Sequence, residues 1–452
     1  MKEEHTIVIE TALYTPHTET GLELCKLASF KGDRVSYLPL WKYLPNIETH
    51  LFTEKSLSKR IKEASEKAIV KILPERVKYI DLPKTYHQEV ETIYDRQTSY
   101  RNFPIASYVH SNLMTMFKST QIASKDELYC YAVEELLKIA FTSYYLVWKF
   151  LQDNDKSNVI LCNGRFVSQA ACYFAAKETG NSYLIHERGS SLTTFKLFNH
   201  SLHDIVELAK TMRKFNEGFS KEAIKLNGAK FYYSNRNKID RVYRQPSKKQ
   251  DLGQLGRFSA VKNYVSFFVS SDFESSALFE DQLNNGLGNQ KEAFERLHLL
   301  CNSLGKQLIV RMHPNYPESG ADYDFWIKKR KNVHVIRPTD AVDSYEILEC
   351  SDIVTTYIST IAMEALFLYK PVICLGKGFY HECKEIMQPS NDDELRNCLL
   401  NPKKPMNRTF ALNYGNYQTE HGMSHIIYKP ESIDRGSIEG YTLSDIFQGK
   451  FK

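Results

Sequence analysis

The first half of the chain opens with a short apolar run, a polar loop and a helical pattern. Alternation of apolar and polar positions predicts strands at residues 6–14 and 34–38, with a helix between them that ends near Lys31. The same order returns further on, with a predicted strand at 158–162 and a helix at 167–179. Strand–helix–strand order with short connections is typical of a doubly wound sheet.

The second half alternates more regularly between apolar strands and amphipathic helices. This order predicts a parallel sheet covered by helices on both faces. The predicted strands are residues 264–270, 307–312, 333–337, 353–358 and 371–376, and the predicted helices are 289–303, 323–331, 343–350 and 359–369.

A polar, basic stretch at residues 235–262 has little apolar periodicity and predicts a linker between two domains. We expect an α/β chain of two doubly wound, Rossmann-like domains that face a cleft. The expected boundaries are 1–245 for an acceptor-side domain, 246–405 for a nucleotide-binding domain, and 406–452 for a segment that packs back on the first domain. Ligands of such sheets bind beyond the carboxyl ends of the strands, so the polar residues at those ends are the candidates for chemistry.

Composition narrows the class of protein. Hydrophobic residues make up 42% and charged residues 25% of the chain, and the net charge is only +5, which argues against a nucleic-acid partner. No run reaches the roughly 18 apolar residues of a membrane span. The nine cysteines are scattered and form no CxxC pair, which favours reduced, buried thiols over disulfides or zinc. We expect a cytoplasmic protein without a metal site.

The predicted strand 307–312 ends in Arg311-Met312-His313-Pro314-Asn315. Arg311 and His313 are two apart on a strand, so they point to the same face and can meet one anionic group. Pro314 ends the strand and fixes the direction of His313. The alternative is a surface strand end with an incidental histidine.

A second candidate is the junction where the predicted strand 353–358 meets a helix that begins at Ser359-Thr360. Free backbone N–H groups and two hydroxyls at such a point can bind a phosphate, with Tyr357 beside them and Glu364 available to ribose hydroxyls. No glycine-rich P-loop is present, which argues against a kinase-type ATP site. The alternative is that Ser359 only caps the helix.

Polar residues also follow strands of the first half. Asn163 and Arg165 follow the strand 158–162, and His186-Glu187-Arg188 follows the next one. A carboxylate between a histidine and an arginine can act as a general base, and it can equally form a structural ion pair. Further candidates for contact with the donor phosphate or the acceptor are His17, Ser271 and Asp272.

These motifs resemble those of the capsule-polysaccharide biosynthesis glycosyltransferases, a group that includes bacterial Kdo transferases and shares motif style with bacterial sialyltransferases. The resemblance rests on RMHPN at 311–315, on residues 351–376 and on Phe379-Tyr380. In the first half, CNGRF at 162–166 and HERGS at 186–190 are also similar.

The resemblance implies a GT-B fold with the donor nucleotide in the second domain. His313 and Pro314 would then contact the nucleotide, and Ser359 and Thr360 its phosphate. Shared motifs with enzymes of CMP-activated acidic sugars favour a CMP-linked over a UDP-linked donor and no further cofactor. The chain departs from the family at Ile358, where glycine is frequent, and at residues 272–274, where an acidic pair is frequent.

The prediction is therefore a metal-independent, inverting glycosyltransferase that moves a sugar, such as Kdo, to a bacterial surface polysaccharide or lipid-linked glycan. Glu187 is the predicted base, and His313 the second predicted catalytic residue. The basic linker and tail are compatible with peripheral association at the inner face of the plasma membrane. The alternatives are a sugar-nucleotide epimerase, a polyol-phosphate transferase, and a non-catalytic glycan-binding subunit of capsule assembly.

Overall fold

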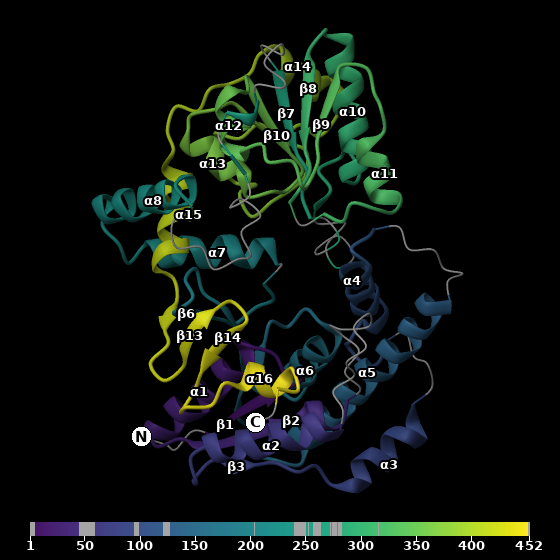
Figure 1. Cartoon of the computed structure of the whole chain (residues 1–452), viewed down its shortest axis with the longest axis vertical. Helices are drawn as coiled ribbons and strands as arrows, with labels where there is room; N and C mark the ends of the chain where they lie inside the picture. The colour runs from purple at the N-terminus through teal and green to yellow at the C-terminus, as the bar shows by residue number, and fades with distance from the viewer. Residues whose placement is uncertain are drawn as a thin grey trace. The chain divides into compact units, whose positions relative to one another are not determined.

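The computed structural model describes residues 5–44, 59–94, 99–120, 127–202, 204–238, 250–251, 253–255, 264–271, 273, 278, 283–314 and 316–450. Its contacts divide the chain into two compact units. Unit 1 comprises residues 1–117, 122–202 and 422–452, and unit 2 comprises residues 118–121 and 203–421. Each unit is built on a largely parallel sheet, so the predicted α/β class is confirmed (Figure 1). The cleft expected between two domains stays a prediction.

Unit 1 contains a seven-stranded sheet with the order β12-β6-β5-β4-β1-β2-β3. Its strands are β1 (His5–Glu10), β2 (Arg34–Pro39), β3 (Lys78–Tyr79), β4 (Asn158–Cys162), β5 (Ser182–Arg188), β6 (Thr194–Phe198) and β12 (Met423–Ser424). Its helices are α1 (His17–Phe30), α2 (Lys59–Ile72), α3 (Lys84–Ile93), α4 (Ile105–Phe117), α5 (Glu127–Gln152), α6 (Val167–Glu178) and α16 (Leu443–Phe447), with a short 3-10 helix at Leu40–Lys42.

The strand order of unit 1 reverses between β1 and β4. From β1 the chain proceeds to β2 and β3 on one side, and from β4 to β5 on the other, all parallel. β6 and β12 then add antiparallel strands at that edge. A reversal of this kind leaves a crevice at the carboxyl ends of the strands, which is where ligands of open α/β sheets bind. The residues after β1, β4 and β5 surround this point.

Unit 2 contains a five-stranded parallel sheet with the order β11-β10-β7-β8-β9. Its strands are β7 (Tyr264–Phe268), β8 (Gln307–Arg311), β9 (Val333–Ile336), β10 (Ile353–Thr356) and β11 (Val372–Cys374). Its helices are α7 (Ile205–Asn216), α8 (Lys221–Arg236), α10 (Gln290–Ser303), α11 (Ala321–Ile327), α12 (Ser344–Cys350), α13 (Ile361–Phe367), α14 (Asp392–Leu400) and α15 (Thr409–Glu420). Here the order reverses between β7 and β10.

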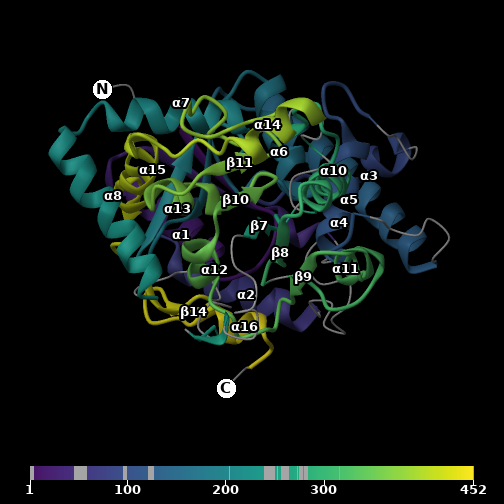
Figure 2. The ribbon, with the colours of Figure 1, turned by 90° about the horizontal axis from the view of Figure 1, so that it is seen from above.

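Helices cover both faces of the unit 2 sheet (Figures 1 and 2). On one face, Phe267 of β7 packs on Phe294 of α10 and Trp326 of α11. The other face contributes Val354 and Ile309 to a buried cluster with residues of α8, α12, α13 and α15. Burial on both faces explains the continuous apolar runs from which these strands were predicted.

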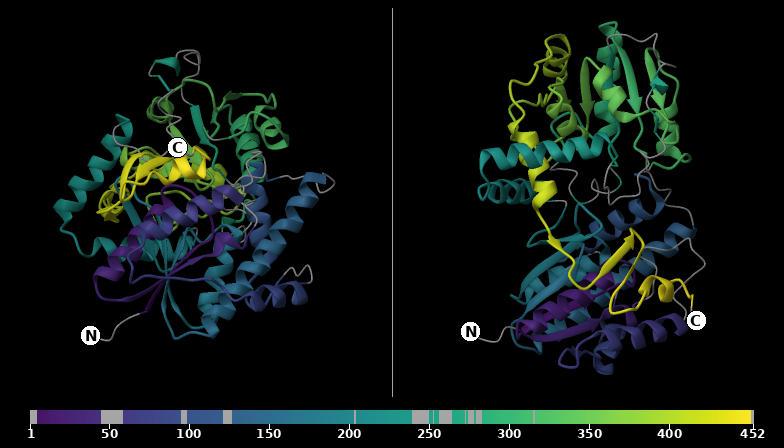
Figure 3. Two further views of the ribbon diagram at one scale, coloured as in Figure 1. Left: turned by 60° about the horizontal axis from the view of Figure 1, so that its bottom comes forward. Right: turned by 60° about the vertical axis from the view of Figure 1, so that its left-hand side comes forward.

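The C-terminal segment returns to unit 1 from residue 422. Figure 3 shows this yellow segment lying along the purple helices of unit 1. It carries a hairpin, β13 (Lys429–Ser432) and β14 (Arg435–Ser437), and buries Tyr428, Ile438 and Leu443 against α1 and α2. The Glu23 carboxylate accepts hydrogen bonds from the backbone of Ile426, at 2.5 Å, and of Ile427, at 2.9 Å.

The division by contacts differs from the expected boundaries at 245 and 405. Residues 203–238 belong to unit 2, because α8 crosses α15 where Gly228 and Gly415 allow their backbones to touch. Residues 205–236 form two helices, α7 and α8, and Ser220 caps the start of α8. α8 also extends to Arg236, inside the predicted linker, most of which lies outside the described residues.

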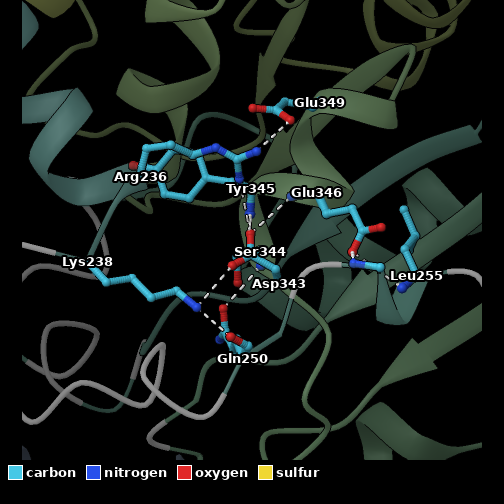
Figure 4. Close-up of polar contacts among 10 residues, drawn as sticks. Arg236, Lys238, Gln250, Leu255, Asp343, Ser344, Tyr345, Glu346 and Glu349 are labelled. Atoms are coloured by element: carbon cyan, nitrogen blue, oxygen red, sulfur yellow. Dashed lines mark hydrogen bonds and ion pairs between the residues drawn. The ribbon is translucent and has the colours of Figure 1, made fainter.

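Charged side chains join the end of α8 and the short described stretch after it to both ends of α12. Arg236 pairs with Glu349 at 3.0 Å and with Asp343 at 3.4 Å, and Lys238 pairs with Asp343 at 3.5 Å (Figure 4). Asp343 also caps α12 by accepting from two of its backbone N–H groups. These ion pairs add to the α8–α15 contact that places α8 in unit 2.

Within the described ranges, no helix is both long enough and apolar enough to cross a membrane.

Candidate functional site

Glu187, the predicted base, lies on β5 at the centre of a polar cluster in unit 1. Its Oε2 accepts a hydrogen bond of 2.5 Å from the side-chain amide of Asn163, and its Oε1 accepts one of 2.8 Å from the backbone N–H of Arg188. The ring Nε2 of His17 lies 3.5 Å from Oε1. The side chain of Glu187 is 21% exposed, so the carboxylate is positioned by protein groups and still reachable from solvent. Asn163, His17 and Glu187, which are far apart in the sequence, therefore lie close together in the structure.

The turn after β4 directs Asn163 toward Glu187. Asn163 and Gly164 both have positive φ, of 51° and 74°. Glycine adopts such values without strain, and asparagine tolerates them better than most residues do. An added Cβ at Gly164 would lie 2.9 Å from Ile185, so this position also needs the absence of a side chain.

His17 begins α1, directly after the loop that follows β1. Its Nδ1 lies 3.1 Å from the thiol of Cys162, and the Tyr14 hydroxyl lies 3.0 Å from the same sulfur. Burial, together with the positive charge of Arg188, lowers the pKa of His17 to about 3. The imidazole is therefore neutral at physiological pH. Cys162, which ends an apolar strand, was not among the predicted site residues.

His186 is the parallel-strand neighbour of Cys162, since the two are paired in the register of β4 and β5. Its side chain is buried, and burial, followed by the effect of His17, lowers the pKa of His186 to about 3. Ligand atoms of His17, Cys162 and His186 lie within 4.8 Å of one another. Neutral imidazoles and a thiol are groups that can bind a transition-metal ion.

Two buried carboxyl groups, those of Glu19 and Glu10, lie in the same part of unit 1. Burial raises the pKa of Glu19 to about 7, although its Oε1 accepts a hydrogen bond from the Thr15 hydroxyl at 2.7 Å. Burial also raises the pKa of Glu10, at the end of β1, well above its usual range. Lys196 faces Glu187 in the register of β6 and β5, and burial lowers its pKa to about 8. The surroundings of Glu187 thus contain several groups whose pKa values are shifted from their usual ranges.

Two predicted arginines are directed elsewhere. Arg165 donates from Nη1 to the Thr115 hydroxyl of α4, at 2.7 Å. Arg188 donates from Nη2 to the carbonyl of Thr15, at 3.0 Å, and so holds the loop that leads to His17. The structural role that sequence reasoning left open for Glu187 and Arg188 is therefore not an ion pair between the two side chains.

In unit 2, a hydrogen-bond network joins the ends of β7 and β10. The Ser270 hydroxyl accepts from the backbone N–H of Ile358 at 3.1 Å and lies 3.4 Å from the Thr356 hydroxyl. Thr356 Oγ1 in turn accepts from the backbone N–H of Ser359 at 3.3 Å. The loop before α13 is thereby fixed at the point where the strand order of unit 2 reverses.

Ser359 and Thr360 occupy the turn that enters α13. Ser359 Oγ accepts from the N–H of Ile361 at 3.3 Å, as a capping residue does, and Thr360 makes no side-chain capping bond. The Tyr380 hydroxyl donates to the Ser359 carbonyl at 3.1 Å. Thr360 is exposed, so the turn is open to solvent. Capping by Ser359 and a role in phosphate binding remain compatible.

Arg311 ends β8 and His313 follows it, on the other side of β7 from β10. Arg311 is buried and donates from Nη1 to the carbonyl of Arg337 at 2.6 Å, and burial lowers its pKa to about 10. Burial, followed by the charge of Arg311, lowers the pKa of His313 to about 4. Because β8 and β10 both neighbour β7, their ends are about 10 Å apart at the usual strand spacing. That span suits a nucleotide.

Some of the remaining predicted residues lie in the described part of unit 2, and others lie outside the described residues. Pro314 follows His313, Ser271 follows the end of β7, and Tyr357 donates to the Gly288 carbonyl at 2.9 Å. Glu364 lies in the first turn of α13, near enough to Tyr232 of α8 to contribute to the raised pKa of that phenol. Asn315 and Asp272 lie outside the described residues.

Comparison with known proteins adds one match in sequence. The family described as capsule polysaccharide biosynthesis protein matches residues 280–410, which are 131 of the 452 residues and include Arg311, His313, Ser359 and Thr360. No curated protein matches the chain.

Several solved structures are similar at low identity. The β-Kdo 2,4-transferase of Thermosulfurimonas dismutans KpsC matches with 15% identity and a TM-score of 0.39, over 65% of this chain and 86% of that one. The β-Kdo 2,7-transferase of the same KpsC matches with 12% identity and a TM-score of 0.36, over 78% and 98%. The UDP-GlcNAc 2-epimerase of Methanocaldococcus jannaschii matches with 12% identity and a TM-score of 0.31, over 91% and 98%.

The part of unit 2 that carries the strand-end motifs thus matches the capsule polysaccharide biosynthesis family, and the predicted resemblance to that family is confirmed over residues 280–410.

Proposed function

We propose that the chain is a glycosyltransferase that moves a sugar from a nucleotide donor to a glycan acceptor during assembly of a bacterial surface polysaccharide. The proposal rests mainly on the hydrogen-bond network of Ser270, Thr356 and Ser359 at the strand reversal of unit 2. These residues lie inside or beside the segment that matches the capsule family. Ligands of parallel α/β sheets bind at such reversals.

The donor phosphate is proposed to bind at the turn of Ser359 and Thr360. The backbone N–H groups of residues 359–361 are proposed to donate to phosphate oxygens, those of Ser359 and Ile361 in exchange for their bonds to side-chain hydroxyls. Arg311 and His313, at the end of β8, are proposed to contribute from the other side of β7. Donors that are already fixed in direction stabilise charge on the leaving phosphate without reorganisation. No metal ion is needed at the phosphate in this proposal, and a CMP-linked acidic sugar such as Kdo is the favoured donor.

Glu187 is proposed to take the proton from the acceptor hydroxyl. The acceptor oxygen then forms a bond to the anomeric carbon while the bond from that carbon to the donor phosphate breaks, which inverts the configuration. A carboxylate held by Asn163 and the Arg188 N–H is pre-oriented for this role. A lipid-linked or surface glycan is the proposed acceptor, with the protein at the inner face of the plasma membrane.

The test is a transfer assay with radiolabelled CMP-, UDP- and GDP-sugars and a mixture of glycan acceptors. We expect one donor to label an acceptor, and His313→Ala to lower kcat/KM at least about 100-fold while the variant stays folded. His110→Ala serves as the control, because His110 is exposed on α4. Interconversion of free nucleotide sugars without transfer, or equal activity of His313→Ala and the parent, would contradict the proposal.

A further inference from the structure

Three side chains from adjoining strand ends of unit 1 form a buried group. His17 starts α1, Cys162 ends β4, and His186 lies beside Cys162 on β5. Their exposed fractions are 5%, 2% and 1%, and their ligand atoms lie within 4.8 Å of one another. The strands that carry Cys162 and His186 are central in the sheet, so the group is held by a rigid scaffold.

The distances suit a tetrahedral metal ion. With Zn–S near 2.3 Å and Zn–N near 2.0–2.1 Å, a sulfur and a nitrogen on one ion are roughly 3.5 Å apart. Cys162 Sγ and His17 Nδ1 are 3.1 Å apart, so a small rotation accommodates an ion between them. His186 contributes a buried Nδ1 that has no hydrogen-bond partner. A buried polar atom without a partner is costly, and a metal bond would satisfy it.

The Glu187 carboxylate lies near His17. The Nε2 of His17 lies 3.5 Å from Glu187, on the side of the ring opposite the nitrogen that faces Cys162. Metal-binding histidines usually donate their other ring N–H to a carboxylate, which fixes the tautomer and orients the ring. Asn163 holds that carboxylate in turn, at 2.5 Å. The cluster therefore contains the outer partners of a metal site as well as its ligands.

We propose that His17 Nδ1, Cys162 Sγ and His186 Nδ1 bind one divalent transition-metal ion, with zinc the best fit. One thiolate and two imidazoles suit zinc far better than magnesium or calcium, which prefer oxygen ligands. Three protein ligands leave a fourth position for water or a substrate oxygen, as in catalytic zinc sites. The Tyr14 hydroxyl lies 3.0 Å from Cys162 Sγ and so belongs to the same group of side chains.

Binding exchanges the thiol proton of Cys162 for the metal ion. The sulfur keeps its electron pair and donates it to the ion, one proton leaves to the solvent, and nothing is oxidised or reduced. This site is separate from the proposed donor site of unit 2, so it does not depend on the glycosyltransferase proposal and can be tested without a sugar substrate.

The test is titration of the full chain, freed of metal by dialysis against a chelator, with Co²⁺ and then Zn²⁺. We expect one Co²⁺ per chain, a thiolate-to-metal charge-transfer band, and displacement of Co²⁺ by Zn²⁺. Cys162→Ser should remove the band and weaken binding at least about 100-fold, and Glu187→Gln should weaken it about 10- to 100-fold through His17. Cys130→Ser, at an exposed position of α5, is the matched control and should bind as the parent does.

The proposal is overturned if the parent shows no saturable band, or if Cys162→Ser keeps it. Should Cys162→Ser fail to fold by circular dichroism, His17→Gln and His186→Gln replace it, and each must weaken Co²⁺ binding. A band that survives in both histidine variants but is lost in Cys130→Ser would place the ion at the surface and would equally overturn the proposal.

Discussion

The ring Nε2 of His17 lies 3.5 Å from the Glu187 carboxylate, although 170 residues separate the two in the chain. His17 follows β1 and Glu187 lies on β5, and Asn163, in the turn after the intervening strand β4, donates to the same carboxylate. The pair marks the reversal of strand order in unit 1, where a ligand of a doubly wound sheet is expected.

If Glu187 is the general base, Glu187→Gln should lower kcat by at least about 100-fold and leave donor affinity unchanged, because the donor is bound by residues of unit 2. Steady-state kinetics with varied donor, together with the melting temperature of the variant, checks this. Glu91→Gln, at an exposed position of α3, is the control. A variant that loses stability but keeps kcat would assign Glu187 a structural role instead.

The pH dependence of stability should show the effect of the lowered pKa of His313. Its pKa is about 4 in the folded chain and near 6.5 when unfolded. Between about pH 4 and pH 6.5 the unfolded chain binds a proton at His313 that the folded chain does not. The stability that the neutral His313 contributes is therefore complete above about pH 6.5. As the pH falls toward 4, the free energy of unfolding decreases by up to about 1.4 kcal/mol per pH unit. Urea unfolding of the parent and of His313→Gln between about pH 4 and pH 7 should give a difference that changes with pH in this window; a constant difference would contradict it.

The crossing of α8 and α15 should not tolerate a side chain at Gly415. An added Cβ there would lie 2.6 Å from the Gly228 carbonyl oxygen of the facing helix. We expect Gly415→Ala to lower the free energy of unfolding by about 1–3 kcal/mol, measured by urea denaturation. Gly218→Ala is the control, since its nearest atom would be at 3.5 Å. Equal stability of the two variants would mean that the helices are not packed this closely.

Glu23 should hold the C-terminal segment on unit 1. Its buried carboxylate binds the ring Nδ1 of His425 at 2.6 Å as well as the backbone N–H groups of Ile426 and Ile427. Glu23→Ala removes all three bonds and leaves the buried His425 side chain without this partner, so we expect a loss of about 1–3 kcal/mol and faster proteolytic cleavage near residue 425. Glu63→Ala, at an exposed position of α2, should change neither. Unchanged cleavage in Glu23→Ala would show that other contacts anchor the segment.

Much of the parallel framework could be predicted from the sequence, because strands buried on both faces give unbroken apolar runs. β4, β7, β8 and β10 lie at or within a residue or two of their predicted positions. β12 could not be predicted, since it has only two residues and exposed side chains, and β6 was missed because Lys196 interrupts its apolar run. The place of α8 was also hidden, because it depends on contact between Gly228 and Gly415, which are far apart in the sequence.

The candidate site was predictable where polar residues follow a strand. Asn163, Glu187, His313 and Ser359 were found by this rule, and the structure places them at strand ends. Cys162 was missed because an apolar strand that ends in cysteine looks like core. Its proximity to His17 and His186 comes from the strand order β1-β4-β5, and no spacing in the sequence encodes it.

The most direct measurement is a crystal structure of the chain with bound CMP, or with the nucleotide that the transfer assay selects. We expect its phosphate to lie within about 3 Å of the backbone N–H groups at residues 359–361, with His313 in contact with the same nucleotide. A nucleotide bound in unit 1, or in unit 2 away from the ends of β7, β8 and β10, would contradict it.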